Sequence, residues 1–415
     1  MKGVKLVLIL GLVMLLAVAF VVSSCKPAPT VEEPIKVGWL GKVDHTRGIA
    51  EKYAAKMAVD EVNAAGGILG RPVELCIVDS KLTAEGAVTA VHKLVEVDKV
   101  HFLTGGLGSE TTVAAREAAM DAKKIFIAVG SATHDNISVV VEEPGRYKYF
   151  FRISPPDELD DEAHYVVFDE LPWLKAQMEE KLGHEVNKVA VLTDAAMWQD
   201  LCHPYFLEEI PKQGFEIVWE GRLSTSAKDC SVELSGIKKS GAQIIVTGTA
   251  YGSTLPLVRQ WGEMEVPAMW SGANVLAMTP GFWERTEGKC VYSSTYNLGG
   301  TDAPINKITQ EFYAKVEPEV GCYYDTHGPY VAVWAYKHAC EKAGTTETEA
   351  VVKALEEIRF ETVGGVLDFK ANHTVLWAPD NMILFTVQHQ PGGKLVVIHP
   401  EDIATGELML PPWIK

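Results

Sequence analysis

Residues 57–75 have the sequence MAVDEVNAAGGILGRPVEL, which contains the end of one regular element and the start of another. Apolar side chains in residues 47–64 recur at intervals of three and four, and this spacing predicts an α-helix. The pair Gly66–Gly67 ends that helix. Residues 73–78 are rich in β-branched and other apolar side chains and predict a strand. The stretch therefore predicts a helix, a glycine turn and a strand in succession.

The same alternation extends in both directions from this stretch. Short β-rich runs alternate with amphipathic segments as far as residue 129, and a second series starts near residue 186. Such alternation is typical of parallel sheets with helices on both faces. We therefore predict an α/β fold of two doubly wound units, divided around residues 152–157. The predicted strands are 35–40, 73–78, 100–103 and 125–129, then 186–193, 215–219, 242–247, 268–270 and 291–293.

Two further elements follow the second unit. A helix is predicted at 330–342, and residues 363–397 alternate in a β manner. The pair Gly392–Gly393 lies inside that β region and predicts a hairpin turn.

The N-terminus has the pattern of an export signal. A short cationic start precedes an apolar run over residues 6–22, and small residues follow it. The ending at residues 22–25 resembles a bacterial lipobox, which implies cleavage of residues 1–24 and lipidation of Cys25. An uncleaved N-terminal anchor is the alternative, and both place the folded part outside the cytoplasmic membrane. Residues 25–34 are rich in proline and predict a stiff tether.

Charge and cysteine content exclude several classes of protein. The 415 residues carry a formal net charge of -17, which opposes binding to a polyanion, so we expect no nucleic-acid partner. No Cys-x-x-Cys pair is present, which argues against zinc and thioredoxin-like sites. An exported chain can form disulfides, and Cys202 with Cys230 is the favoured pair. Cys76 lies in a predicted strand, and we expect a buried free thiol there.

Small hydroxyl residues follow two of the predicted strands. Ser109 comes after the glycine-rich residues 105–108 and starts a predicted helix, while Ser131 and Thr133 follow strand 125–129. Ligands of open α/β sheets bind beyond the carboxyl ends of the strands, and a helix start favours a carboxylate. The alternative is that these residues are ordinary helix caps.

The glycine stretch, together with three later segments, resembles the leucine/isoleucine/valine-binding family of solute-binding proteins. The quoted run at 57–75 carries the Asn-Ala-x-Gly-Gly-Ile-x-Gly-Arg pattern, and 149–152, 341–344 and 364–369 agree with it. The resemblance covers nearly all of residues 35–400. It implies a type I periplasmic binding protein fold, with two parallel-sheet lobes joined by three hinge crossings. The implied lobes are 35–152 plus 296–361, and 153–295 plus 362–415.

The resemblance also implies a mode of action and site residues. Such proteins bind a small ligand by cleft closure and deliver it to the permease and ATPase of an ABC importer. Ser109 and Thr133, with Ser131 beside them, would hold the main-chain atoms of an amino acid. Trp198 stands where family members have an aromatic residue, and it would pack against the ligand or, alternatively, only against its own lobe. Tyr251 would close over the ligand with it.

The chain departs from the family at its charged positions. Ser253 stands at or near the place of the acid that neutralises the ligand's ammonium. An unpaired buried ammonium costs several kcal/mol, so either Asp325 supplies the charge or the ligand has no α-ammonium. Arg47, with no acid assigned to it, would make the cleft locally cationic and favour a second carboxylate. The alternative is that Arg47 pairs with Asp44 or faces solvent.

These observations predict a binding protein rather than an enzyme. His45, His134 and His327 fall in cleft-side loops but lack metal-ligand spacing, and no nucleotide, hydrolase or zinc-protease motif is present. We expect no cofactor and no metal, and a monomer held at the membrane by its lipid anchor. Amino acids lead as ligand class, before carboxylates including aromatic acids, and then amides. A ligand-binding sensor with a separate signalling partner is the alternative function.

Overall fold

The computed structural model describes residues 33–299 and 302–415. The predicted leader, Cys25 and the predicted tether up to residue 32 lie outside the described residues. Within the described ranges, no helix combines the length and the apolar character needed to cross a bilayer. Residues 35–415 form one compact unit.

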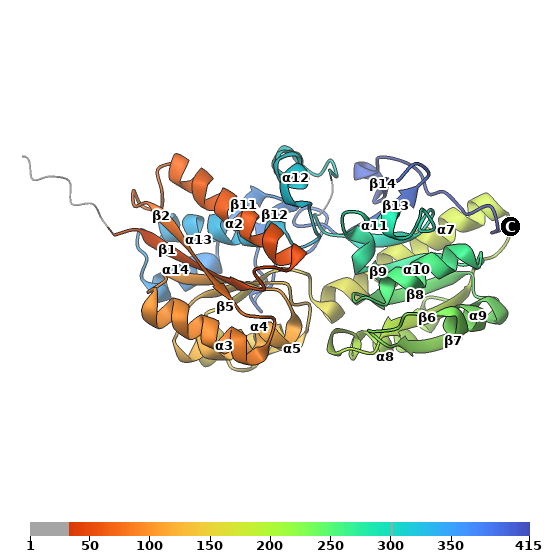
Figure 1. Cartoon of the computed structure of the whole chain (residues 1–415), viewed down its shortest axis with the longest axis horizontal. Coiled ribbons are helices and arrows are strands. Elements are labelled where there is room, and N and C mark those ends of the chain that lie inside the picture. The colour runs from red at the N-terminus through yellow and green to blue at the C-terminus, as the bar shows by residue number, and fades with distance from the viewer. Residues whose placement is uncertain (1–32, 300–301) are drawn as a thin grey trace, which may run out of the picture. The chain divides into compact units, whose positions relative to one another are not determined.

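Five parallel strands form the sheet of the first lobe, in the order β2-β1-β3-β4-β5. Figure 1 labels β1, β2 and β5 of this sheet. β1 pairs on both sides, so that Val37 lies opposite Leu75 of β2 and Phe102 of β3. The central strands β3 and β4 are buried along their whole length because helices cover both faces. The strand bounds are β1 Ile35–Gly41, β2 Val73–Asp79, β3 Phe102–Gly106, β4 Phe126–Val129 and β5 Phe150–Ser154.

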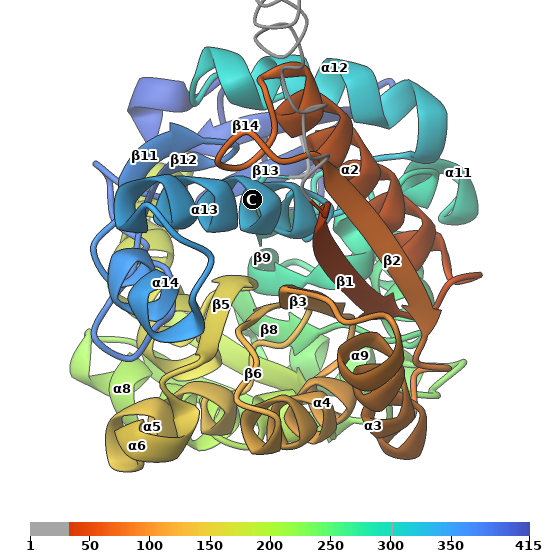
Figure 2. The same ribbon diagram turned by 90° about the vertical axis from the view of Figure 1, so that its left-hand side faces the viewer.

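Helices from distant parts of the chain cover this sheet. α2 and α13 lie on one face, and α3, α4 and α5 lie on the other (Figure 2). The ring of Tyr336 on α13 stacks on Phe102 of β3 with 4.1 Å between centroids, which joins the C-terminal half of the chain to the first sheet. The helix bounds are α2 Thr46–Ala64, α3 Ala84–His92, η1 Lys93–Val97, α4 Ser109–Asp121, α5 Asp135–Glu142, α6 Pro144–Tyr147, α12 Lys307–Val320, α13 His327–Ala343 and α14 Thr348–Leu355.

The second lobe has a four-stranded parallel sheet in the order β7-β6-β8-β9. Successive side chains of a strand point to opposite faces. Val189 and Val191 of β6 therefore pack in the core under α7 and α8, while Ala190 and Leu192 pack in the core under α9 and α10. The bounds are η2 Glu158–Ala163, η3 Val166–Glu170, α7 Leu171–Leu182, β6 Lys188–Asp194, η4 Met197–Gln199, α8 Cys202–Lys212, β7 Glu216–Leu223, α9 Ser231–Ser240, β8 Ile244–Thr249, α10 Thr254–Glu263, β9 Met269–Asn274, η5 Val275–Met278 and α11 Phe282–Arg285.

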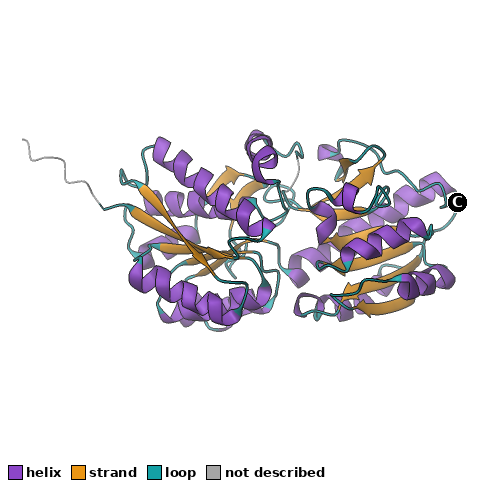
Figure 3. Cartoon of the chain, in the orientation of Figure 1, coloured by secondary structure: helices purple, strands orange, loops and turns teal. Residues whose placement is uncertain are grey.

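The remaining strands pair antiparallel. Figure 3 shows helices packed around the strands of both lobes. The prediction of a fifth parallel strand at 291–293 is wrong: β10 (Ser294–Asn297) pairs antiparallel with β13 (Phe385–Gln390). A short β-rich run carries no information about its direction, and here the C-terminal hairpin supplies the partner. β13 continues into β14 (Lys394–His399) through Gly392 and Gly393, both with positive φ, which confirms the predicted hairpin turn. β11 (Arg359–Thr362) and β12 (Gly365–Asp368) form a second hairpin, and η6 (Glu401–Ile403) follows β14.

The favoured disulfide between Cys202 and Cys230 is wrong. Cys202 packs in the core under α7 and α8, whereas Cys230 packs in the core under α9 and α10, so the sheet separates the two thiols. All six cysteines of the described ranges are free. Cys76 is free as predicted, but it is only partly buried because β2 is an edge strand.

A buried carboxylate ties three elements of the second lobe together. Glu170, at the end of η3, is 1% exposed. One of its oxygens accepts hydrogen bonds from the Ser271 hydroxyl (2.7 Å) and the Gly272 amide (2.6 Å) of β9. The other accepts from the Thr386 hydroxyl of β13 (2.8 Å). Despite these donors, burial raises the pKa of the Glu170 carboxyl to about 7.

The raised pKa predicts a pH-dependent stability. The folded protein retains a proton that the unfolded chain, with a pKa of about 4.3, has already lost. The resulting stability is present below about pH 4.3 and is lost as the pH rises through 7. Glu170→Gln removes the titration while keeping an acceptor for β9. As the pH rises from about 5 to 8, we expect the unfolding free energy of the variant to increase by about 2 kcal/mol relative to that of wild type. Urea-induced unfolding measures this difference.

The matched control is Glu180→Gln on the exposed side of α7. Glu180→Gln removes a carboxylate from the solvated surface, so its unfolding free energy should differ from that of wild type by a constant amount across the same pH range. Identical pH slopes for Glu170→Gln and wild type would contradict the prediction.

Candidate ligand-binding cleft

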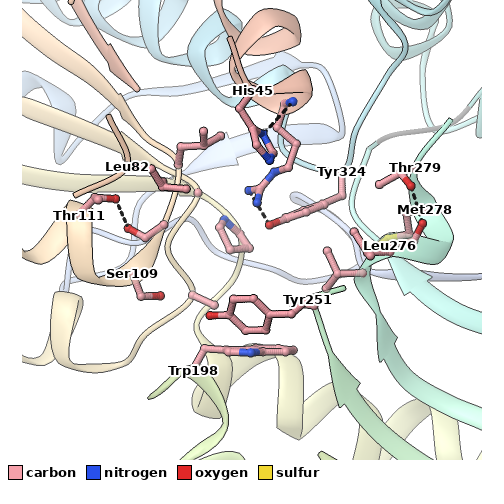
Figure 4. A pocket seen from close by; sticks show the side chains of 18 of the residues that line it. His45, Leu82, Ser109, Thr111, Trp198, Tyr251, Leu276, Met278, Thr279 and Tyr324 are labelled. Atoms are coloured by element: carbon pink, nitrogen blue, oxygen red, sulfur yellow. Dashed lines mark hydrogen bonds between the residues drawn. The ribbon is translucent and has the colours of Figure 1, made fainter. Parts of the chain in front are cut away.

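Loops at the carboxyl ends of both parallel sheets line one cavity of about 400 Å³ (Figure 4). The first lobe contributes the loops after β1, β2, β3 and β4, and the second lobe contributes those after β6, β8 and β9. In Figure 4, Ser109 and Thr111 lie on one side of the cavity, while Leu276, Met278 and Thr279 lie across it. This is the position at which open α/β sheets bind ligands. Its volume suits a small molecule.

Two glycines bring the start of α4 to the cavity. Gly105 has a φ of +102°, and a Cβ placed on it would lie 2.1 Å from the carbonyl oxygen of Leu40 on β1. Gly106 has a φ of +134°, and its Cβ would lie 2.4 Å from the Thr112 hydroxyl. The backbone can therefore turn sharply from β3 into α4. The N-cap residue Gly108 has no side chain to accept from the first turn, so the positive end of the helix dipole is left uncapped at the cavity.

Four of the eight predicted ligand-binding residues line the cavity. Arg47 and Ser109 do so from the first lobe, and Trp198 and Tyr251 from the second. Trp198 is buried, with an indole N–H that has no hydrogen-bond partner, whereas Tyr251 is 40% exposed. Figure 4 shows the Trp198 and Tyr251 rings on the same side of the cavity.

The other four predicted residues lie behind the cavity lining. Ser131 is buried with its hydroxyl 3.5 Å from that of Ser109, and the buried Thr133 hydroxyl has no hydrogen-bond partner. Ser253 donates to Asp194 at 3.3 Å within the second lobe. Asp325 is fully buried and holds Arg47.

The acid that matches Arg47 was not assigned from the sequence, and it is Asp325. The Arg47 Nε donates to Asp325 Oδ2 at 3.0 Å, and a terminal nitrogen donates to the Tyr324 hydroxyl at 2.7 Å. The guanidinium also lies 4.8 Å from the centre of the Tyr324 ring. The expectation that Arg47 makes the cleft cationic is therefore wrong, because a fully buried carboxylate neutralises it. Asp325 is likewise already engaged by a protein cation.

A third acid lies beside this pair. Glu51 on α2 is fully buried, and burial together with Asp325 raises the pKa of its carboxyl well above the ordinary range. Burial thus favours the protonated, uncharged form of Glu51 beside the Arg47–Asp325 pair.

Glu162 is the lining residue that sequence reasoning missed. It belongs to η2, a π-helical turn in the segment that leaves β5, and its side chain is 5% exposed. Burial raises the pKa of its carboxyl to about 8. The available signal was the acidic run at residues 157–162, which comes directly after the predicted break. π-Helical turns are frequent at functional sites.

The three histidines have separate roles. His45 lines the cavity and caps α2, accepting from the Arg47 amide at 3.3 Å. His134 lies 3.1 Å from Asp157, whose other oxygen binds Arg152 at 3.0 Å. His327 is fully buried, and burial lowers the pKa of its ring to about 4, so it is neutral at physiological pH.

Comparison with known proteins adds independent findings. Residues 34–394 match the family model described as periplasmic binding protein. A leucine-, isoleucine-, valine-, threonine- and alanine-binding protein of Pseudomonas aeruginosa is 26% identical over 327 residues, which is 78% of this chain and 81% of that protein.

Solved structures agree in fold. A putative branched-chain amino acid ABC transporter protein from Silicibacter pomeroyi superposes with a TM-score of 0.79 at 19% identity, covering 92% of this chain and all of that chain. A branched-chain amino acid transporter substrate-binding protein of Streptococcus pneumoniae, in complex with isoleucine, gives 0.71 at 22% identity, covering 91% and 100%. At this level of identity the superpositions show the two-lobed type I fold.

Proposed function

The chain belongs to the periplasmic binding protein family, and we propose that it captures an amino acid outside the cytoplasmic membrane and delivers it to an ABC importer. Members of this family are solute-binding receptors, so the chain is a binding protein and not an enzyme. The observation that carries the proposal is the cavity of about 400 Å³, which both lobes line at the ends of their parallel strands.

The cavity lining supports an amino acid with an apolar side chain. The uncapped start of α4 at Ser109 offers backbone N–H groups and a positive dipole end, which suit a carboxylate. Apolar and aromatic side chains make up much of the rest, and they suit an aliphatic or aromatic group. They include Leu82, Leu107, Trp198, Leu276, Met278 and Leu298. The names of the relatives are consistent with this ligand class.

We propose a sequence of docking and closure. The ligand first binds the first lobe through Ser109, with Ser131 and Thr133 supporting that loop from behind. Trp198 and Tyr251 of the second lobe then close over it, while Ser253 orders their lobe through Asp194. Ligand shifts the equilibrium toward the closed form by its differential affinity for that form. The permease and ATPase of the importer then recognise the closed form.

The proposal also covers the membrane anchor and the division of the chain into two lobes. Cys25 would carry the lipid, and residues 25–34 would tether a monomeric body to the membrane. The two lobes would comprise residues 35–152 plus 296–361 and residues 153–295 plus 362–415. Labelling cells with an alkyne-bearing fatty acid would test the anchor, since a Cys25→Ala variant should lose the label.

A ligand screen tests the proposed function. We expect aliphatic or aromatic L-amino acids to raise the thermal unfolding temperature, because a ligand at a hundredfold its Kd adds about 2.7 kcal/mol of stability. Ser109→Ala should weaken the best ligand about tenfold by calorimetry, through loss of a hydrogen bond to a charged group. Ser226→Ala, on an exposed loop of the second lobe, is the matched control and should bind as wild type does. Stabilisation by amides alone, or by no small solute, would overturn the amino-acid assignment.

A further inference from the structure

Among the described residues, the acidic side chains that line the cavity have no lining cation of their own. In the described part of the chain, Arg47 is the one Lys or Arg among the lining residues, and Asp325 already neutralises it. Two carboxylates also line the cavity: Glu110, which is exposed, and Glu162, which is 5% exposed. The cavity therefore has a buried acid with no lining cation available to it.

The cations near Glu162 bind other acids, although the charge of Arg152 also acts on the Glu162 carboxyl and opposes the rise in its pKa. Arg152 of β5 binds Asp157 at 3.0 Å and also donates to the carbonyl oxygens that follow β4. Lys370 binds Asp161 at 2.8 Å. Glu158 lies on the same turn, and burial raises the pKa of its carboxyl to about 8. Glu158 is therefore neutral at pH 7, and the turn supplies no positive charge to Glu162.

The remaining neighbours of Glu162 are neutral groups from other elements. The Tyr296 hydroxyl of β10 hydrogen-bonds to its carboxyl. Cys202 of α8 and Tyr324 also lie within electrostatic range, and burial raises the pKa of each, so both are uncharged at neutral pH.

Aromatic side chains line the cavity together with this acid. Tyr296 and Trp198 are both buried and line the cavity, and Tyr324 lines it too, although its ring already faces the Arg47 guanidinium at 4.8 Å. Aromatic faces attract organic cations, and the attraction is strongest where water is excluded. A carboxylate among such faces suits an ammonium group rather than an anion.

We propose that Glu162 binds the ammonium group of the ligand and so takes the place of the acid that is missing near Ser253. This inference rests on the proposed function and narrows the ligand to α-amino acids with apolar or aromatic side chains. The ligand's carboxylate lies at the start of α4, and its ammonium lies at η2, on the segment that leaves the first lobe.

The proposal predicts that ligand binding releases a proton. The pKa of about 8 means that the empty site holds the Glu162 proton at pH 7. An ammonium stabilises the ionised form and lowers that pKa, so binding at pH 7 should release up to one proton. Affinity should therefore rise between about pH 6 and pH 8, by up to tenfold per unit.

Calorimetry with paired probes tests the assignment. L-leucine and L-phenylalanine are compared with 4-methylpentanoate and 3-phenylpropanoate, which lack the amine, in buffers of different ionisation enthalpy. In wild type, we expect at least one amino acid to bind more than tenfold more tightly than its partner, with release of a proton. Glu162→Gln should weaken that amino acid more than tenfold, abolish proton release and leave the partner acid within threefold.

Asp160→Asn is the matched control, since it removes a carboxylate from the exposed side of the same turn. It should bind as wild type does and keep the proton release. Unchanged amino-acid affinity in Glu162→Gln, or equally tight binding of the amine-free acids to wild type, would overturn the role of Glu162 and leave the receptor function standing. If none of the four probes binds wild type, the amino-acid function itself fails and the inference fails with it.

Discussion

Replacing Arg47 by methionine is expected to lower the free energy of unfolding by about 3–5 kcal/mol. The substitution leaves Asp325, which is fully buried, without its cation, and it also removes the donor to the Tyr324 hydroxyl. Glu51 beside it cannot compensate, because it is a second acid in the same buried space. The methionine replaces the aliphatic volume, so the loss reports the charge rather than a cavity. Urea-induced unfolding at neutral pH measures it.

Two further variants separate the effect of the lost charge from the other effects of the Arg47→Met substitution. Lys56→Met breaks the pair with Asp60 on the same helix, where both side chains are more than 60% exposed, and should cost less than about 0.5 kcal/mol. Adding Asp325→Leu to Arg47→Met should recover at least half of the loss, since no uncompensated charge remains. A loss below about 1 kcal/mol for Arg47→Met would show that this arginine does not stabilise the fold.

The second large effect is expected from Gly105→Ala. Its Cβ would lie 2.1 Å from the Leu40 carbonyl oxygen, and its φ of +102° disfavours any side chain. Backbone strain and overpacking together should cost about 3–5 kcal/mol in urea-induced unfolding. The start of α4 would also shift, so ligand affinity should fall in any variant molecules that still fold.

Gly66→Ala provides a control with the same backbone conformation. Gly66 has a φ of +97°, but no atom lies within 4 Å of its Cβ position. The Gly66→Ala variant should therefore lose about 1 kcal/mol of unfolding free energy, which is the cost of the backbone conformation alone. Equal losses at Gly105 and Gly66 would mean that the contact with Leu40 relaxes without cost.

The elements of the parallel sheets could be predicted because their signals are local. The helix at 47–64 and the strand at 73–78 follow from side-chain spacing and the glycine pair, and α2 and β2 confirm them. The direction of a strand is not a local property. β10 therefore escaped prediction, since the hairpin that pairs with it lies almost ninety residues further along the chain.

The residues of the site were predicted less completely, because several of their contacts join positions that are far apart in the sequence. Ser109 follows a strand end, and that position predicted it at the cavity, while the family resemblance predicted Trp198; both residues line the cavity. The bond between Arg47 and Asp325 joins residues 278 positions apart, and no periodicity encodes such a pairing. Glu162 was missed because an acidic run is usually a solvated surface, whereas the π-helical turn buries this member of it.

The free cysteines make the timing of folding important for this protein. Five of the six described thiols are buried, and burial raises the pKa of Cys230, Cys290 and Cys340 to about 11 or 12. Thiolate, the reactive form, is therefore almost absent in the native state. An unfolded chain arriving in an oxidising compartment has no such shield. In such a compartment folding would compete with crosslinking, and chains that fold first would keep their thiols reduced.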